Sequence, residues 1–239
     1  MSYFELMGLG EGAWGRSMLM AAVVTLSVAA CGYLLGIVFG CLGAAAKLSR
    51  LKTLNWMAST YTTVFRGVPD LLIVYLFYFG SSGVLTAIGK WFGATGFIGA
   101  PAFLIGSVAI GVISGAYQTE VLRGAYSALS RGELEAARAV GMSRFLMLRR
   151  VIVPQAMRFA IPGLGNVWQL ALKESALLSV TGLVELMRQA QIGAGSMRMP
   201  FTFFLTAGML YLVITLLTGW LFRKLEQRAQ RGVRKAAWA

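Results

Sequence analysis

The sequence of 239 residues contains no histidine, only two cysteines and only nine carboxylates. Without histidine or a C-x-x-C pair, neither a zinc site nor a Cys/His or Ser/His nucleophile can be assembled. Cys31 and Cys41 lie in one apolar run, where helical rise separates them by about 15 Å, which excludes a disulfide between them. A G-x-x-x-x-G-K-[ST] phosphate loop is also missing. We therefore expect no catalytic residue, no metal site and no cofactor bound by this chain.

Charged residues are scarce as well, at 13% against 57% hydrophobic residues, where a soluble domain has roughly 25% and 45–50%. The charge-free runs 17–46, 91–119 and 199–222 each exceed the roughly 20 residues that cross a bilayer core. Two further apolar regions, 53–89 and 159–184, contain internal charges. The sequence predicts an all-α integral membrane protein with five transmembrane helices. We expect these helices at about 17–46, 57–80, 100–122, 160–184 and 201–222.

The positive charges predict how the chain is oriented, because short inner loops carry an excess of Lys and Arg. With the N-terminus outside and five crossings, sixteen of the 22 basic residues fall on the inner side, including the C-terminal end. The outer side receives Arg16, Lys90, Arg188 and Arg198. We interpret the excess as a topology signal and an attraction to anionic membrane lipid, rather than as a nucleic-acid site. The five spans predict a single transmembrane domain over residues 1–239, without a soluble module.

Small residues form stripes on two of the expected helices. Gly32, Gly36, Gly40 and Gly43 share one face of the first span, which lets another helix approach closely. We favour packing against a neighbouring helix or a second subunit over a pore-lining role. The third span carries a similar small and weakly polar face, which a helix wholly exposed to lipid would not need. This second face consists of Ser107, Gly111, Ser114 and Gln118.

The second span is interrupted near its middle. Pro69 cannot donate a backbone hydrogen bond to the carbonyl of Phe65, so the helix is expected to kink or break there. Arg66 and Asp70 would share a face if the helix continued. Burying both charges in lipid costs several kcal/mol unless they pair or meet water.

A polar stripe also enters the fourth span. Asn166, Gln169 and Lys173 recur at i, i+3 and i+7. Lys173 is either a counter-ion for Glu174 or Asp70, or a contact for a transported species.

Between the third and fourth spans lies an inner loop, residues 123–158, with a helix-compatible amphipathic pattern. It is either a helix on the lipid surface or a docking element for a cytoplasmic partner. The loop reads E-A-A-R-A-V-G from 135, then nine residues, then V-I-V-P from 151. This resembles the E-A-A-x-x-x-G-x9-I-x-L-P signature of membrane subunits of bacterial ABC importers.

The residues of this motif suit an ATPase-coupling loop with the EAA motif. Glu135 opens it, and the small Ala136 and Ala137 let a short helix seat in a cleft of an ATPase. Gly141 ends that helix, and Pro154 is expected to stop the next segment. We expect Gly141→Asp to uncouple the loop.

Four more blocks, at 66–70, 115–120, 123–125 and 162–173, resemble the polar amino acid uptake family. They are most similar to the Q-type subunits of histidine, basic amino acid and opine permeases. The resemblance implies a type I ABC importer permease fold in a bacterial inner membrane. It also implies a heterodimer with an M-type permease subunit, two copies of an ABC ATPase that binds ATP and magnesium, and a periplasmic solute-binding protein.

The resemblance places a carboxylate, Asp70, directly after the R-G-x-P turn, where it could attract a cationic solute. Alternatively, Asp70 only neutralises Arg66, or Arg66 meets the carboxylate of the solute. The candidate substrate path consists of Arg66, Asp70, Gln118, Glu120, Asn166, Gln169, Lys173 and Glu174. Two alternatives are an ATP-independent channel or secondary transporter, and a scaffold subunit without a solute path. The absence of internal repeats disfavours the secondary transporter.

Overall fold

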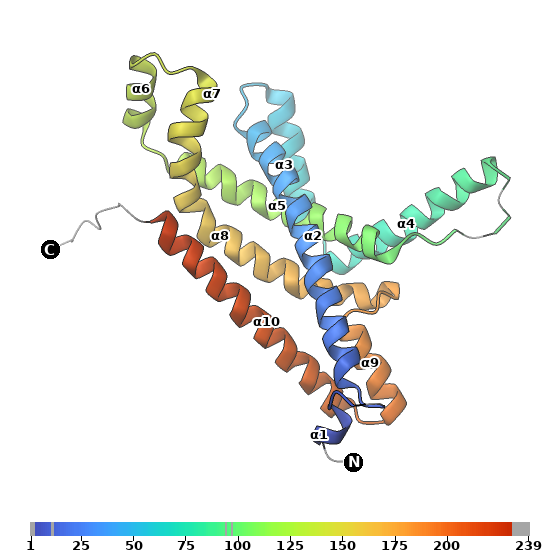
Figure 1. Ribbon diagram of the computed structural model, residues 1–239. Helices are drawn as coiled ribbons and strands as arrows, with labels where there is room; N and C mark the ends of the chain where they lie inside the picture. The colour runs from blue at the N-terminus through green and yellow to red at the C-terminus, as the bar shows by residue number, and fades with distance from the viewer. Residues whose placement is uncertain (1–2, 11, 94, 97, 231–239) are drawn as a thin grey trace.

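A computed structural model describes residues 3–10, 12–93, 95, 96 and 98–230 of the chain, and this part is helical without a strand (Figure 1). The first half contains α1 (Tyr3–Leu6), α2 (Gly15–Lys47), α3 (Lys52–Gly67), α4 (Asp70–Trp91) and α5 (Ala102–Ser127). The second half contains α6 (Arg131–Ala139), α7 (Arg144–Met147), the π-helical turn η1 (Leu148–Ile152), α8 (Val153–Glu174), the 3-10 segment η2 (Ser175–Thr181), α9 (Leu186–Met197) and α10 (Pro200–Ala229). The all-α prediction is confirmed.

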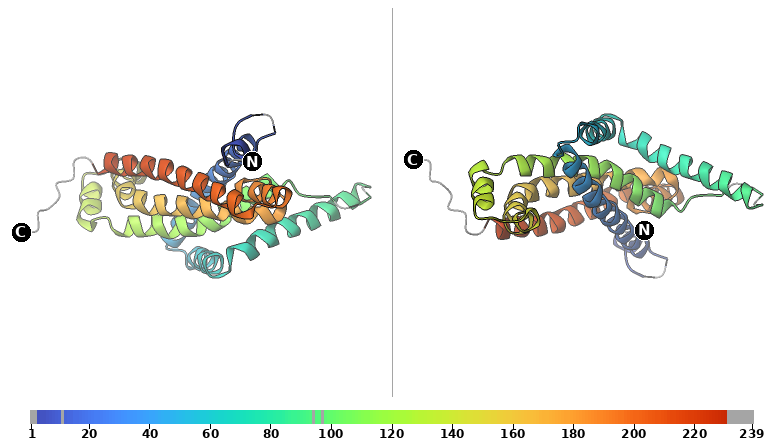
Figure 2. Two further views of the ribbon diagram at one scale, coloured as in Figure 1. Left: turned by 90° about the horizontal axis from the view of Figure 1, so that it is seen from below. Right: turned by 90° about the horizontal axis from the view of Figure 1, so that it is seen from above.

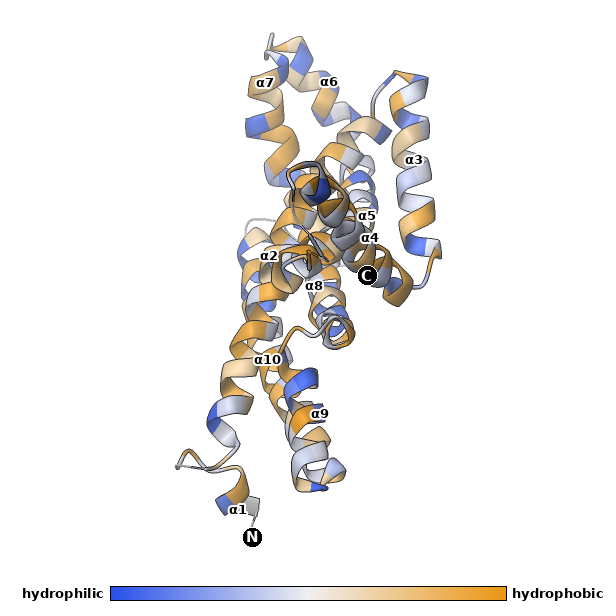
Figure 3. Cartoon of the chain, turned by 90° about the vertical axis from the view of Figure 1, so that its right-hand side faces the viewer, coloured by the Kyte–Doolittle hydropathy of each residue, from blue (hydrophilic) through white to orange (hydrophobic). Residues whose placement is uncertain are grey.

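Four helices, α2, α4, α5 and α10, are long and apolar enough to cross a membrane. Large apolar side chains cover their outer surfaces; on α10, Leu212 is 55% exposed and Leu217 is 63% exposed. Such an exterior suits lipid, where helices satisfy their own backbone hydrogen bonds. Hydrophobic residues predominate along the long helices, and hydrophilic residues gather around α6 (Figure 3). α8 is less apolar, since polar residues such as Gln155, Asn166 and Gln169 are spread along it, and it does not belong to these four.

The glycine stripe of α2 packs against the small polar face of α5, so the predicted packing against a neighbouring helix is confirmed within the chain. A Cβ atom at Gly36 would lie 2.3 Å from Ser114 Oγ, and one at Gly43 would lie 2.3 Å from Thr119 Oγ1. The backbones of α2 and α5 therefore approach closely, which only glycine permits at these positions of α2. In the views from below and above, α2 crosses the bundle that α5, α8 and α10 form (Figure 2).

Gly36→Val is expected to lower the thermal stability of the protein. The new side chain would collide with Ser114 and Gln118, and overpacking of this kind costs about 1–3 kcal/mol. Gly208→Val is the matched control, because nothing lies within 4 Å of a Cβ atom at that position of α10. Melting curves of the detergent-purified variants measure the difference. Equal melting temperatures for the two variants would contradict the close α2–α5 contact.

The break predicted in the second span is present. α3 ends at Gly67, α4 begins at Asp70, and the backbone of Val68 and Pro69 between them is extended. α4 leaves the bundle as an arm that contacts α5 near its base (Figure 1). Asp70 therefore occupies the first turn of a new helix instead of the middle of a continuous one.

The EAA loop folds as the motif predicts as far as Gly141. Gly141 has a φ of 76°, and its N–H donates to the carbonyl of Arg138 at 2.9 Å. The N–H of Met142 donates to the carbonyl of Ala137 at 3.2 Å, which completes a Schellman motif. The glycine thus ends α6 and reverses the chain.

The expectation that Pro154 stops the following segment is wrong. The chain stays helical from Arg144 through η1 into α8, which ends at Glu174. Proline lacks an N–H and its ring crowds the carbonyl four residues earlier, that of Arg150. The wider π-helical turn directly before α8 provides room for this conflict, so the helix continues.

The predicted fourth span, 160–184, is α-helical only as far as Glu174. Its regular part ends at Glu174, η2 follows, and Gly182 turns the chain with a φ of 85°. The connection to the last span contains α9, which the sequence patterns did not predict. Glu185, fully buried, caps α9 by accepting hydrogen bonds from the N–H groups of Met187 (2.8 Å) and Arg188 (2.7 Å).

Candidate functional site

Two carboxyl groups from distant parts of the chain meet at the helix break. Asp70 begins α4 and Glu174 ends α8, and their side chains are close enough to interact electrostatically. Glu174 is only 4% exposed, and neither of its carboxylate oxygens makes a hydrogen bond of ordinary geometry. An unpaired buried carboxylate is costly, and a second one nearby adds repulsion. The pair forms a site that a cation would stabilise.

Arg66 lies at the edge of the same site. Its guanidinium stands over the ring of Tyr117, 5.3 Å from the centroid, as in a cation–π contact. Tyr117 also interacts electrostatically with Asp70 and Glu174. No ion pair joins Arg66 to Asp70 in the part of the chain that the structure describes. This geometry gives no support to the interpretation that Asp70 merely neutralises Arg66.

Lys173 does not serve as the counter-ion that the sequence offered as one alternative. It is exposed, and within the described ranges it makes no ion pair with Glu174 or Asp70. Consecutive residues of a helix point in directions about 100° apart, so the two side chains diverge.

Gln118 lies in the α2–α5 contact and not beside the carboxyl pair. It is fully buried, and its Nε2 donates to the carbonyl of Tyr33 at 3.2 Å. Its Oε1 is buried without a hydrogen-bond partner. Gln118 therefore joins two helices of this chain, and it shares no contact with the carboxyl pair.

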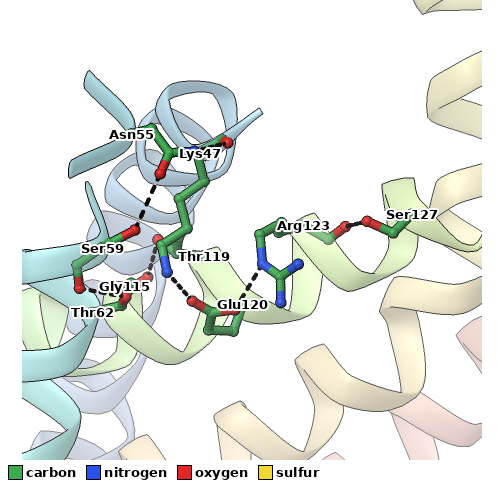
Figure 4. A network of polar contacts seen from close by, with 9 residues as sticks. All are labelled: Lys47, Asn55, Ser59, Thr62, Gly115, Thr119, Glu120, Arg123 and Ser127. Carbon is green, nitrogen blue, oxygen red and sulfur yellow. Dashed lines mark hydrogen bonds and ion pairs between the residues drawn. The ribbon is translucent and has the colours of Figure 1, made fainter. Parts of the chain in front are cut away.

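Glu120 of α5 points toward Lys47 of α2 and links the two helices (Figure 4). Its carboxylate forms an ion pair with Lys47, and its other oxygen accepts a 2.9 Å hydrogen bond from Nε of Arg123. Asn55 of α3 donates to the carbonyl of Lys47 at 2.6 Å. Glu120 therefore joins α5 to α2, and Asn55 joins α3 to the same end of α2.

Asn166 and Gln169 line a separate pocket of about 210 Å³ between α8 and α10. Gly219 and Phe222 of α10 form the opposite wall. Gln169 Oε1 is buried there without a partner. The eight predicted path residues thus divide among several places, and only Arg66, Asp70 and Glu174 lie around one site.

The residues of the EAA motif also differ in their surroundings: some are exposed and one is buried. Glu135 and Ala136 are exposed on α6, as docking requires. Ala137 is only 5% exposed, because it packs against Leu129 and Met147 inside the loop. Its small side chain therefore takes part in the loop's own packing.

The structure adds three candidate functional residues that the motif did not single out. Val140 (73% exposed) and Phe145 (72% exposed) present apolar side chains beside Gly141. Exposed apolar groups at the tip of a polar loop indicate a protein contact. Tyr117 directly precedes Gln118 and lies one turn before Glu120 on α5, and only the fold brings it to Arg66.

A buried polar node on the opposite side of the molecule was also not predicted. The Glu185 carboxylate accepts hydrogen bonds from Tyr211 Oη (3.1 Å) and Thr25 Oγ1 (3.5 Å), and thereby joins α9 to α10 and α2. Thr25 Oγ1 in turn accepts one from the N–H of Leu186 at 2.9 Å. In the sequence, Glu185 stands next to an expected outer loop, and nothing there indicated that it would be buried and hydrogen-bonded to other helices.

An all-helical membrane protein with exposed apolar helices, a buried charged site and a protruding polar loop belongs to the class of transport subunits. Residues 32–231 match the family model described as "Binding-protein-dependent transport system inner membrane component". The chain belongs to this family. It is therefore an inner-membrane permease component of an ABC importer, in which ATP hydrolysis is carried out by a partner ATPase.

Known proteins resemble the chain over nearly its whole length. The octopine transport system permease protein OccQ of Rhizobium radiobacter is 59% identical over 98% of this chain and 99% of its own. The nopaline transport system permease protein NocQ of Agrobacterium fabrum (strain C58 / ATCC 33970) is 50% identical over 96% and 98%. A crystal structure of an amino acid ABC transporter with histidines has a TM-score of 0.77 and 32% identity, over 90% of this chain and 95% of that one.

Proposed function

We propose that this permease component carries a polar solute with a cationic group, such as an opine or a basic amino acid, past the carboxyl pair Asp70 and Glu174. One observation supports this most strongly: Glu174 is buried beside a second carboxyl group, that of Asp70, and no cationic side chain forms an ion pair with either of them in the described ranges. A guanidinium or ammonium group entering between them would satisfy both. The similarity to OccQ of an octopine transport system and NocQ of a nopaline transport system agrees with this class of solute.

The other end of the solute has a candidate partner as well. Arg66 is exposed and stands over Tyr117 beside the two carboxyl groups. Its planar guanidinium can bind a carboxylate through two parallel hydrogen bonds. An amino acid or opine carries a cationic group and a carboxylate. The carboxyl pair would bind the cationic group, and Arg66 would bind the carboxylate. Asn166, Gln169 and Lys173 are proposed as later contacts along α8.

We propose five crossings, formed by α2, the α3–α4 pair, α5, α8 and α10, with the N-terminus outside and the C-terminus inside. A single transmembrane domain over 1–239 then forms the path together with an M-type permease subunit. Residues 123–158 would be the coupling loop of this domain, in contact with one of two ATPase copies that bind ATP and Mg²⁺. A periplasmic binding protein would deliver the solute.

Closure of the ATPase dimer would reach the helices through α6. The exposed Glu135 and Ala136 provide the contact, and the Schellman turn at Gly141 holds α6 at a fixed angle to α7. Because α7, η1 and α8 form one helical run, movement of the loop is carried directly into α8 and so to Glu174. Rigid-body movement of this kind alternates access without any chemistry in this chain.

The proposal is tested on the transporter purified with its partner subunits in lipid nanodiscs. We expect ATP hydrolysis to rise when the binding protein is loaded with an opine or a basic amino acid, and not with a neutral amino acid. A photo-crosslinker placed at Ala136 should capture the ATPase. Stimulation only by a neutral or acidic solute would overturn the cationic-solute assignment, and a crosslink that never includes the ATPase would overturn the coupling role.

A further inference from the structure

An apolar groove of about 320 Å³ lies between α2 and α3, away from the carboxyl pair. Its floor contains the small residues Gly43, Ala46 and Ala58, and larger apolar side chains form its walls. The wall residues are Phe39, Leu42, Leu54, Met57 and Tyr61. The lining of the groove is therefore aliphatic and aromatic, which suits a hydrocarbon chain.

Hydrogen bonds near both ends of the groove keep it open. Asn55 Nδ2 donates to the carbonyl of Lys47 at 2.6 Å, which ties the start of α3 to the end of α2. Tyr61 Oη donates to the carbonyl of Val112 on α5 at 2.7 Å, which fixes α3 further along. α3 is thus held near α2 without closing on it, and small side chains leave the space between them unfilled.

Positive charge lies at one end of the groove. Arg50 is exposed in the turn between α2 and α3, and Lys52 is exposed as the first residue of α3, two positions before Leu54 of the groove. Lys47 is engaged by Glu120, whereas Arg50 and Lys52 take part in no ion pair in the described ranges. The sequence has no carboxylate between Glu11 and Asp70. An anionic headgroup above the groove would therefore meet two cations, while the nearby carboxylate of Glu120 is neutralised by Lys47 and Arg123.

We propose that this groove binds an anionic phospholipid, with one acyl chain between α2 and α3 and the phosphate at Arg50 and Lys52. Basic residues beside an intramembrane groove on the inner side are a known chemistry for anionic lipid recognition. The inference rests on the proposed orientation, which places the α2–α3 turn at the inner surface of the membrane. It is independent of the proposed solute site, because none of the groove residues contacts Asp70 or Glu174 in a described interaction.

The lipid would fill the space that the small residues Gly43, Ala46 and Ala58 leave between α2 and α3. Exposed Leu42 (64%) and Met57 (61%) flank the opening, so an acyl chain can enter sideways from the bilayer. An occupied groove would brace α3 just before the break that positions Asp70. A second permease subunit seated on the same surface is the competing occupant, and the experiment must separate the two.

The test uses the assembled transporter in nanodiscs of phosphatidylcholine with a minor fraction of phosphatidylglycerol. A photo-crosslinking residue is introduced as Met57→p-benzoylphenylalanine, and the mass of the labelled chain identifies what it captured. We expect phosphatidylglycerol to be captured well above its share of the lipid. A product containing another protein subunit, or lipid captured only in proportion to its abundance, would overturn the proposal.

Two variants test the headgroup and the groove separately. Arg50→Gln with Lys52→Gln should weaken phosphatidylglycerol capture by about 30-fold, the effect of two surface charges near anionic lipid. Ala46→Phe should fill the groove and abolish capture while the charges remain. Lys224→Gln with Arg228→Gln is the matched control, since these exposed cations lie on α10 away from the groove. Equal capture in all variants would contradict the site.

Failure of this inference is distinguishable from failure of the proposed function. The same nanodiscs are assayed for ATP hydrolysis stimulated by the solute-loaded binding protein. Stimulated hydrolysis without selective lipid capture would overturn the groove and leave the transport assignment intact. Selective capture that disappears in the Arg50/Lys52 variant supports the groove whichever solute stimulates hydrolysis.

Discussion

Gly141→Val is expected to abolish the coupling of ATP hydrolysis to transport. Gly141 has a φ of 76°, where a β-branched residue is strongly disfavoured at a cost of about 1–3 kcal/mol. The turn would rearrange, so the carbonyls of Ala137 and Arg138 would lose the partners that end α6. α6 would then no longer stand at its fixed angle to α7. We expect solute uptake to fall at least about tenfold and stimulation of ATP hydrolysis by the loaded binding protein to disappear.

The control for this variant is Gly141→Asn, because Asn adopts the left-handed conformation more readily than other L-residues. No atom lies within 4 Å of a Cβ atom built at Gly141, so strain alone, and not a clash, separates the two variants. The Gly141→Asp substitution expected from the sequence to uncouple is a weaker test, since Asp shares this tolerance. Uptake and stimulated hydrolysis at the native level in the Val variant would contradict a coupling role for the turn.

Glu174→Gln is expected to impair transport of cationic solutes strongly without destabilising the protein. Glu174 is buried and forms no ion pair in the described ranges, and the amide of a Gln at this position can still hydrogen-bond to the carboxyl group of Asp70, so little stability is expected to be lost. A bound cation, however, loses a charged hydrogen-bond partner, which is worth roughly 1.5–3 kcal/mol. We expect uptake of the cationic solute to fall roughly 10- to 150-fold, and the melting temperature not to fall. Initial uptake rates in proteoliposomes and melting curves measure both quantities.

Asp70→Asn should show the same loss of cationic solute transport, with assembly with the ATPase intact. Its carboxyl is half-buried at the start of α4, so it has partial access to water and a smaller effect is expected than at Glu174. Lys90→Gln is the control, because Lys90 is exposed in the last turn of α4, at the opposite end of that helix from Asp70, and forms no ion pair in the described ranges. A lower melting temperature with unchanged uptake in the Glu174 variant would assign the carboxyl pair to structure instead of transport.

Local features of the sequence predicted several parts of the structure correctly. The glycine spacing on α2, the break before Asp70 and the turn at Gly141 each depend on residues a few positions apart, whose backbone preferences act wherever the chain is placed. Pro154 shows where such reasoning fails. Proline disfavours a regular α-helical turn, but the chain absorbs it in η1 and continues because α8 packs against α5 and α10.

The candidate site could be predicted only in part. Arg66 and Asp70 stood out as charges in an apolar run, and Glu174 stood out in another, but the sequence offered Lys173 and Arg66 as their partners. The actual neighbours, Tyr117 for Arg66 and Asp70 for Glu174, come from helices far apart along the chain. Glu120 and Gln118 looked equivalent to these residues in sequence and are instead engaged between α2 and α5.

The sequence by itself determined that this protein is helical, lies in a membrane and carries the EAA loop, because composition, hydropathy and local motifs act over short stretches of chain. Only the tertiary structure decided which polar residues meet. An intramembrane carboxylate can form an ion pair, accept hydrogen bonds or lie beside another carboxyl group. Which of these occurs depends on the packing of distant helices, and no periodicity along one helix encodes that contact. The carboxyl pair at the α3–α4 break, the groove beside α3 and the buried Glu185 node are all products of that packing.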